Sequence, residues 1–217
     1  MVSIAIDGPA GAGKSTIAKL VAEKLGYVYV DTGAMYRSIA LYFLNNDIDC
    51  EDEQAVLSAC QNINVEIKYE EGVQQVYLNG ENVSTAIRQE TVGNMASKVA
   101  AKKPVRELLL QLQRDIAASK DVIMDGRDIG TFVLPNADVK IYLTASVKTR
   151  AKRRYDQLVE KGETPDISKI EADIEQRDYQ DMNREIAPLK QADDAIYLDT
   201  SDMSIDEVVE FISSKTK

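Results

Sequence analysis

A glycine-rich stretch near the start of the chain has the residue types and the spacing to hold a phosphate group. It fits the pattern G-x-x-x-x-G-K-[ST], known as the P-loop. The stretch and the residue after it are Gly8, Pro9, Ala10, Gly11, Ala12, Gly13, Lys14, Ser15 and Thr16. Glycines let the backbone approach a phosphate closely, Lys14 brings a positive charge to the β- and γ-phosphates, and the Ser15 hydroxyl can bind Mg²⁺. These residues predict a nucleoside triphosphate site; a purely structural glycine turn is the alternative.

Two further polar groups follow the ends of predicted strands. Thr32 and Arg37 come after the second strand and can grip a phosphate, although Arg37 can equally be a solvated side chain in the first turn of a helix. Asp125 ends a buried strand, where it suits Mg²⁺ directly or through water, or caps the next turn. Arg127 stands between Asp125 and Asp128, so it binds an anion or forms a structural ion pair.

Arg150, Arg153 and Arg154 are spaced to share one helix face. Three like charges repel one another unless an anion joins them, so this face predicts contact with a phosphate; a solvated basic face is the alternative.

Arg177, Asp181 and Arg184 also share a helix face, at i, i+4 and i+7. Asp181 can accept a hydrogen bond from a ribose hydroxyl while the arginines bind phosphoryl oxygens. Salt bridges from Asp181 to both arginines within the helix would explain the same spacing.

The chain has no histidine, the commonest general base. Phosphoryl transfer depends on positioning and charge neutralisation more than on proton chemistry. A nucleoside monophosphate is mostly ionised at pH 7, because its second pKa is about 6, so its oxygen can attack a γ-phosphoryl group without a base. An alcohol acceptor would need one, and Asp31 or Asp125 could serve.

Composition excludes several other classes of protein. The 217 residues contain 26 Lys and Arg against 36 Asp and Glu, a net charge of −10, which argues against a general nucleic-acid or membrane binder. No apolar run reaches the length of a membrane span, and the first strand begins too early for a signal peptide. Cys50 and Cys60 predict neither a zinc site nor a disulfide. We expect a cytoplasmic protein.

The elements that position these groups alternate between strands and helices. Buried strands are expected at residues 2–6, 27–30, 121–124, 139–143 and 195–198. Period-two alternation and an Asn79-Gly80 turn predict a hairpin within residues 62–83, and a charged helical hairpin is expected over 147–183. The sequence therefore predicts an α/β fold: a parallel P-loop sheet flanked by helices, with a small inserted antiparallel β subdomain and ligands at the carboxyl ends of the strands.

Taken together, the motifs resemble bacterial-type cytidylate kinases, within the nucleoside monophosphate kinase family and the P-loop NTP hydrolase fold. The matching segments are residues 6–16, 31–37, 96–100, 104–106 and 125–131, together with Arg177, Asp178, Asp181, Asn183 and Arg184. The resemblance implies a single kinase domain. Its core is formed by residues 1–33, 104–146 and 188–217. Residues 34–103, which include the β insert, form the region that binds the nucleoside monophosphate (NMP). Residues 147–187 form a helical lid.

The resemblance also implies roles for individual residues. Ser97, Arg106 and Asp128 face cytosine, where the carboxylate can accept a hydrogen bond from the N4 amino group. The implied contacts of the monophosphate are Thr32, Tyr36, Arg37, Arg127 and Arg184, while Arg177 and Asp181 contact the sugar or its phosphate. Arg150, Arg153 and Arg154 are implied to close on the transferred group.

The implied activity is transfer of the γ-phosphoryl group of ATP to CMP or dCMP, with Mg²⁺ bridging β- and γ-oxygens. Its catalytic groups are Lys14, Arg127, Arg150, Arg153, Arg154 and Arg184, and its metal ligands are Ser15 and Asp125. We expect a monomer whose partners are these small molecules, with no nucleic acid or membrane. Two alternatives stay open: a P-loop kinase of another nucleotide or a small alcohol, and a non-catalytic nucleotide switch.

Overall fold

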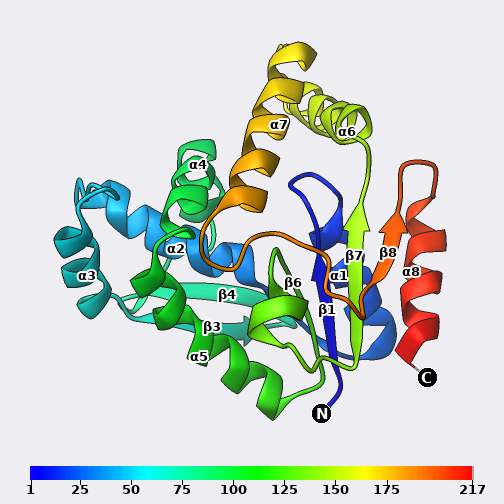
Figure 1. Cartoon of the computed structure of the whole chain (residues 1–217), viewed down its shortest axis with the longest axis horizontal. Helices are drawn as coiled ribbons and strands as arrows, with labels where there is room; N and C mark the ends of the chain where they lie inside the picture. The colour runs from blue at the N-terminus through cyan, green and yellow to red at the C-terminus, as the bar shows by residue number, and fades with distance from the viewer. Residues whose placement is uncertain (217) are drawn as a thin grey trace.

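The computed structural model describes residues 1–216, and its centre is a five-stranded parallel sheet (Figure 1). The strands lie in the order β2-β6-β1-β7-β8, and each neighbouring pair is parallel. Their bounds are Ser3–Asp7 (β1), Val28–Asp31 (β2), Val122–Gly126 (β6), Val139–Thr144 (β7) and Ile196–Asp199 (β8). The predicted parallel sheet flanked by helices is confirmed.

Helices cover both faces of the sheet, which explains why its central strands are apolar at nearly every position. On one face, Ile4 and Ile6 pack with α1 (Lys14–Leu25) and α8 (Ile205–Ser213). On the other face, Ala5 packs with α2 (Thr32–Asn45) and α5 (Lys103–Ser119). Successive residues of β1 therefore serve different cores, as the two-residue period of a strand requires.

Two helix ends have common capping motifs. Gly26 adopts the left-handed conformation at the end of α1, with φ of 70°, and its N–H bonds back into the helix. Ser204 and Glu207 form a capping box at the start of α8.

The insert follows α2 and contains α3 (Glu53–Gln61), a three-stranded antiparallel sheet, a short turn η1 (Ala86–Arg88) and α4 (Glu90–Val99). The strands are β3 (Val65–Glu70), β4 (Val73–Leu78) and β5 (Glu81–Asn82). Asn79 and Gly80 both have positive φ, 50° and 86°, as a type I′ turn between β4 and β5 requires. The predicted antiparallel insert is confirmed.

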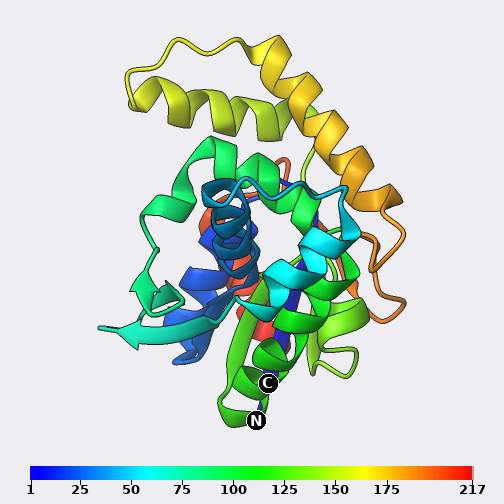
Figure 2. The same ribbon diagram turned by 90° about the vertical axis from the view of Figure 1, so that its left-hand side faces the viewer.

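The charged hairpin consists of α6 (Val147–Glu160) and α7 (Ile167–Asn183), which pack against each other. Both helices stand beyond the carboxyl ends of β7 and β8, as Figures 1 and 2 show. A π-helical turn, η2 (Ile129–Val133), follows β6, and a last short turn, η3 (Ser214–Thr216), follows α8. The division into core, NMP-binding region and lid stays a prediction, and Lys217, the last residue of the predicted core, lies outside the described residues.

Within residues 1–216, no helix is both long enough and apolar enough to cross a bilayer. Cys50 is buried, Cys60 is partly buried, and both are free thiols.

Candidate active site

The P-loop joins β1 to α1, and glycine is required at different positions of the loop for different physical reasons. Gly11 and Gly13 have φ of 74° and 92°, which residues with a Cβ rarely adopt. Gly8 has a packing reason as well, since a Cβ there would lie 1.9 Å from the carbonyl oxygen of Leu143 in β7. The shape of the loop therefore depends on glycine at these three positions.

Lys14 begins α1 and is almost fully buried, 5% exposed, in the loop that precedes it. Its Nζ donates a hydrogen bond to the carbonyl oxygen of Pro9 at 2.7 Å. Burial and the nearby charge of Arg127 lower the pKa of Lys14 to about 7. An anion brought to this point would restore the charged form, so Lys14 is suited to a phosphate.

Asp125, at the carboxyl end of β6, accepts two hydroxyl hydrogen bonds. The Ser15 hydroxyl donates to its Oδ2 and the Tyr29 hydroxyl donates to its Oδ1, each at 2.8 Å. Burial, together with the charge of Asp31, raises the pKa of Asp125 to about 6. Carboxylate and hydroxyl oxygens are ligands that Mg²⁺ accepts, and it commonly uses one or two carboxylates together with substrate phosphates. The pair fits a Mg²⁺ ion shared with a nucleotide.

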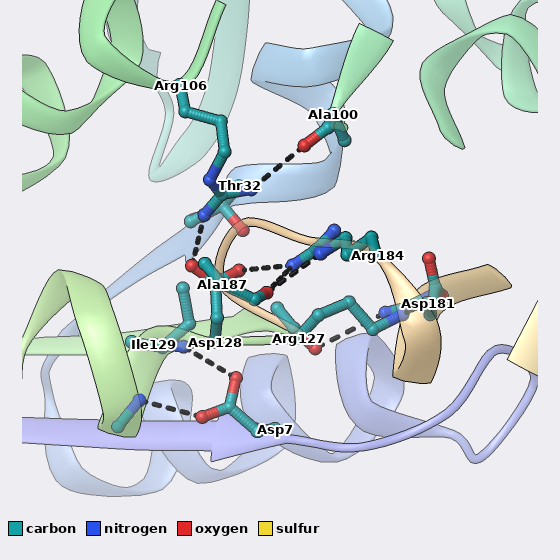
Figure 3. Close-up of polar contacts among 12 residues, drawn as sticks. Asp7, Thr32, Ala100, Arg106, Arg127, Asp128, Ile129, Asp181, Arg184 and Ala187 are labelled. Atoms are coloured by element: carbon teal, nitrogen blue, oxygen red, sulfur yellow. Dashed lines mark hydrogen bonds and ion pairs between the residues drawn. The ribbon is translucent and has the colours of Figure 1, made fainter. Parts of the chain in front are cut away.

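Asp128 lies just beyond β6 and is held between two guanidinium groups (Figure 3). Arg106, on α5, donates to its Oδ2, and Arg184 donates to its Oδ1 at 3.0 Å. Arg106 and Asp128 are 3% and 4% exposed. The structure thus brings together two of the three residues expected to face the base, and Ser97 lines the same cleft.

Asp7, the residue before the P-loop, fixes the turn that follows Asp128. Its two carboxylate oxygens accept from the backbone N–H groups of Ile129 at 2.8 Å and Gly130 at 2.7 Å (Figure 3). Burial raises its pKa to about 6. The segment of residues 6–16 that resembles the kinase family contains Asp7, but it gives no signal for this role, because the partners of Asp7 lie more than 120 residues away.

The cleft between these groups holds about 350 Å³ and is rich in arginine. Five arginines line it: Arg37, Arg88, Arg127, Arg177 and Arg184. The buried Nε of Arg177 makes no hydrogen bond among residues 1–216, and burial together with the charge of Arg127 lowers its pKa to about 10. Such a concentration of positive charge favours a polyanionic ligand.

Arg127 and Asp181 form an ion pair across the cleft, with Nε 2.8 Å from Oδ2 (Figure 3). Although burial opposes ionisation of Asp181, Arg127 holds the pKa of that carboxyl below its usual value. Arg184 lies just past the end of α7 and bonds to Asp128 instead. The alternative in which Asp181 bridges Arg177 and Arg184 within the helix is therefore wrong.

Thr32, Tyr36 and Arg37 of α2 line the cleft and differ in their burial. Thr32 is buried and its hydroxyl donates to the carbonyl oxygen of Asp125 at 2.7 Å. Arg37 donates to the carbonyl oxygen of Ile87 at 3.2 Å, and Tyr36 lines the cleft beside both. Burial raises the pKa of Tyr36 to about 12.

The three arginines of α6 each have a protein partner. Arg150, 4% exposed, donates to the carbonyl oxygens of Ala145 and Ala10, both at 2.9 Å, and pairs with Asp178 at 2.6 Å. These contacts mean that the three like charges do not depend on an anion to lie together.

The other two arginines of α6 differ from each other. Arg153 donates to the carbonyl oxygens of Ala12 and Thr200 at 3.3 and 3.0 Å. Arg154 lies 3.9 Å from Glu90, its side chain 40% exposed, in a wider hollow of about 680 Å³ between α4 and the helical hairpin. Only Arg154 of the three lines the cleft or this hollow in the described chain. The contact of all three with a transferred phosphoryl group stays a prediction.

Sequence reasoning missed Arg88 and Tyr29 as well as Asp7. Arg88 lines the cleft and lies 3.2 Å from the Asp31 carboxylate, but nothing in its sequence neighbourhood sets it apart from a surface arginine. Tyr29 could have been found, because it lies two residues before Asp31 on a predicted strand next to the site.

Comparison with known proteins identifies the family of this chain. The family model described as cytidylate kinase matches residues 4–217. A cytidylate kinase of Lactobacillus gasseri is 54% identical over 213 residues, covering 98% of this chain and 93% of that protein. One from Caldicellulosiruptor saccharolyticus is 52% identical over 209 residues, covering 96% and 92%.

A crystal structure of an uncharacterized protein from Eubacterium ventriosum covers 99% of this chain and 97% of its own, with a TM-score of 0.52 at 12% identity. That likeness shows the fold alone. The match of the family model to residues 4–217 and the identities of 54% and 52% to these two members show that this chain belongs to the cytidylate kinase family.

Proposed function

We propose that the protein transfers the γ-phosphoryl group of ATP to CMP or dCMP, producing ADP and CDP or dCDP. The observation that carries the proposal is Asp128, a buried carboxylate held by Arg106 and Arg184 in a cleft that also reaches the P-loop. The cytidylate kinases of similar sequence support the choice of acceptor.

On the donor side, Lys14 and the backbone of the P-loop hold the β- and γ-phosphates. Lys14 exchanges its bond to the Pro9 carbonyl for phosphate oxygens, which raises its lowered pKa and fixes its charge. Mg²⁺, held by Ser15 and Asp125 with the nucleotide, would supply further charge neutralisation at the same oxygens.

On the acceptor side, the arginines that line the cleft bind the monophosphate. Arg37, Arg177 and Arg184 line the cleft, and Arg127 is oriented by its bond to Asp181. The attacking oxygen is already ionised near neutral pH, so positioning and neutralisation are enough and no protein base is required.

Base selection follows from the carboxylate of Asp128, which Arg106 and Arg184 hold in place. A carboxylate group presents acceptor oxygens, which suits the N4 amino group of cytosine. Uracil presents a carbonyl oxygen at that position, and two acceptors facing each other repel. Asp181 is placed to accept from a sugar hydroxyl, with Arg127 holding its geometry.

Closure of the helical hairpin would exclude water from the reaction. Arg154 is the arginine of α6 with the least engaged side chain, so it is the one most easily recruited to the transferred group. We infer further that the protein acts as a cytoplasmic monomer on small molecules.

The test is an acceptor panel with ADP release as the readout. CMP and dCMP should accelerate ATP consumption far more than UMP, AMP, GMP or small alcohols. Acceleration by a different acceptor would move the protein to another kinase specificity. ATP binding without acceleration by any acceptor would leave only a nucleotide switch.

A further inference from the structure

The insert is joined to the parallel sheet by side chains that take the place of a neighbouring strand. β2 is one of the two outer strands of that sheet, so its outward backbone groups have no ladder partner among the described strands. Gln74 of β4 fills part of this gap: its Oε1 accepts from the N–H of Asp31 at 2.8 Å, and its Nε2 donates to the carbonyl of Asp31 at 3.2 Å.

A second side chain of the insert extends this link along the same edge. Tyr69 lies directly opposite Gln74 in the β3–β4 register, and its hydroxyl donates to the carbonyl oxygen of Tyr29 at 3.2 Å. Tyr29 and Asp31 are two residues apart, so their backbone groups face the same edge of β2. Tyr69 and Gln74 therefore hold the carboxyl-terminal end of β2 at two residues, Tyr29 and Asp31.

Asp31 is the residue at which this link reaches the site. It ends β2 and is also the N-cap of α2, with its Oδ1 accepting from the N–H of Ala34 at 2.9 Å. No loop separates strand from helix, so a shift of Asp31 is passed directly to the first turns of α2. Those turns carry Tyr36 and Arg37, which line the cleft.

We propose that Gln74 is a positioning residue of the acceptor site, which fixes the start of α2 by holding both backbone groups of Asp31. The inserted sheet then contributes to monophosphate binding without touching the nucleotide. The kinetic part of this inference rests on the proposed function, while the link from Gln74 to α2 does not.

A matched pair of variants in β4 tests the proposal. Gln74→Met keeps the length of the side chain and removes both hydrogen bonds to Asp31. Gln75→Met is the control, because within residues 1–216 the Gln75 side chain is bonded only by Asn82, which belongs to the insert. We expect Gln74→Met to raise the KM for CMP about tenfold, which corresponds to about 1.4 kcal/mol.

The KM for ATP and kcat should change little in Gln74→Met, while its melting temperature should fall by a few degrees because two hydrogen bonds of the folded state are lost. All parameters should change little in Gln75→Met. An unchanged KM for CMP would overturn the proposal, as would an equal loss in kcat, both KM values and thermal stability, which indicates a structural role only.

Amide hydrogen exchange provides the readout that does not depend on the substrate. In the protein without nucleotide, Gln74→Met should speed exchange over residues 32–37 relative to both wild type and Gln75→Met, while α1 stays unchanged. Equal amide exchange over residues 32–37 in wild type, Gln74→Met and Gln75→Met would overturn the positioning role of Gln74, even if CMP stimulates ADP release. Faster exchange without any CMP-dependent ADP release would instead contradict the proposed function and leave the link to α2 standing.

Discussion

Replacing Asp128 by Asn separates base recognition from folding. The asparagine side chain has nearly the same volume but keeps only one acceptor oxygen, and it turns an NH₂ group toward one of two buried guanidinium groups. In the wild type, Arg106 and Arg184 each bond to a different carboxylate oxygen. The substitution therefore leaves one arginine without its partner.

Two magnitudes follow from this geometry. Removing one partner of a buried ion pair costs about 3–5 kcal/mol, and the remaining amide oxygen places the expected loss at about 3 kcal/mol. For a chain of this size, that lowers the melting temperature by about 6–12 °C. The CMP preference should also fall, because an amide can present either its oxygen to cytosine or its NH₂ to uracil. A specific base contact contributes about 1–3 kcal/mol, so the ratio of kcat/KM for CMP over UMP should fall by about 5- to 150-fold.

The assay measures kcat/KM for CMP and UMP at a temperature well below the melting point of the variant. Asp178→Asn is the matched control, since Asp178 is also buried and paired with an arginine, but it lies at the base of the helical hairpin. It should lose comparable stability and retain the CMP/UMP ratio. If Asp128→Asn keeps the wild-type ratio, or if both variants lose it equally, the assignment of Asp128 to the base is refuted.

Three further changes have defined outcomes. Lys14→Met should reduce kcat by about two to four orders of magnitude with an unchanged circular dichroism spectrum; near-normal turnover would remove Lys14 from the mechanism. Chelation of Mg²⁺ should stop ADP release, and Ser15→Ala should raise the Mg²⁺ concentration needed for half-maximal activity; an unchanged requirement would exclude Ser15 as a ligand. The pKa of Asp7 is raised on folding from 3.8 to about 6, so the stability it contributes is full below pH 4 and is lost as the pH rises through 6. Between pH 5 and 7.5, the free energy of unfolding of the wild type should therefore fall by about 1 kcal/mol relative to that of Asp7→Asn, which has no titrating group at position 7. Urea unfolding of both proteins at pH 5 and at pH 7.5 measures this change, and an equal difference in stability at the two pH values would contradict it.

Local patterns in the sequence were enough to predict most of the fold. The glycine motif, the apolar periods and the Asn79-Gly80 turn each depend on neighbours within a few residues, so the corresponding elements are confirmed. The parallel strands were also within reach, because their apolar runs alternate with helices.

The partners of charged residues were harder to predict, because they depend on the register between distant strands. Asp7 lies opposite Gly126 in the β1–β6 pair, and only that register brings it to the turn after Asp128. Likewise, the spacing of Arg150 on its helix does not reveal that its partners are the P-loop backbone and Asp178. Spacing along one helix identifies a shared face, but not what the rest of the chain places against it.

The first glycine of the P-loop has a consequence for any mutational survey of this protein. Because an added methyl group would overlap the Leu143 carbonyl, a substitution at Gly8 must push β7 away from β1 before it can affect a nucleotide. Failure of such a variant would report on assembly of the sheet and not on ligand affinity. Gly11 and Gly13, where the added atom has 3.5 Å or more of room and only the backbone angle is strained, are the positions from which loop conformation can be related to nucleotide binding.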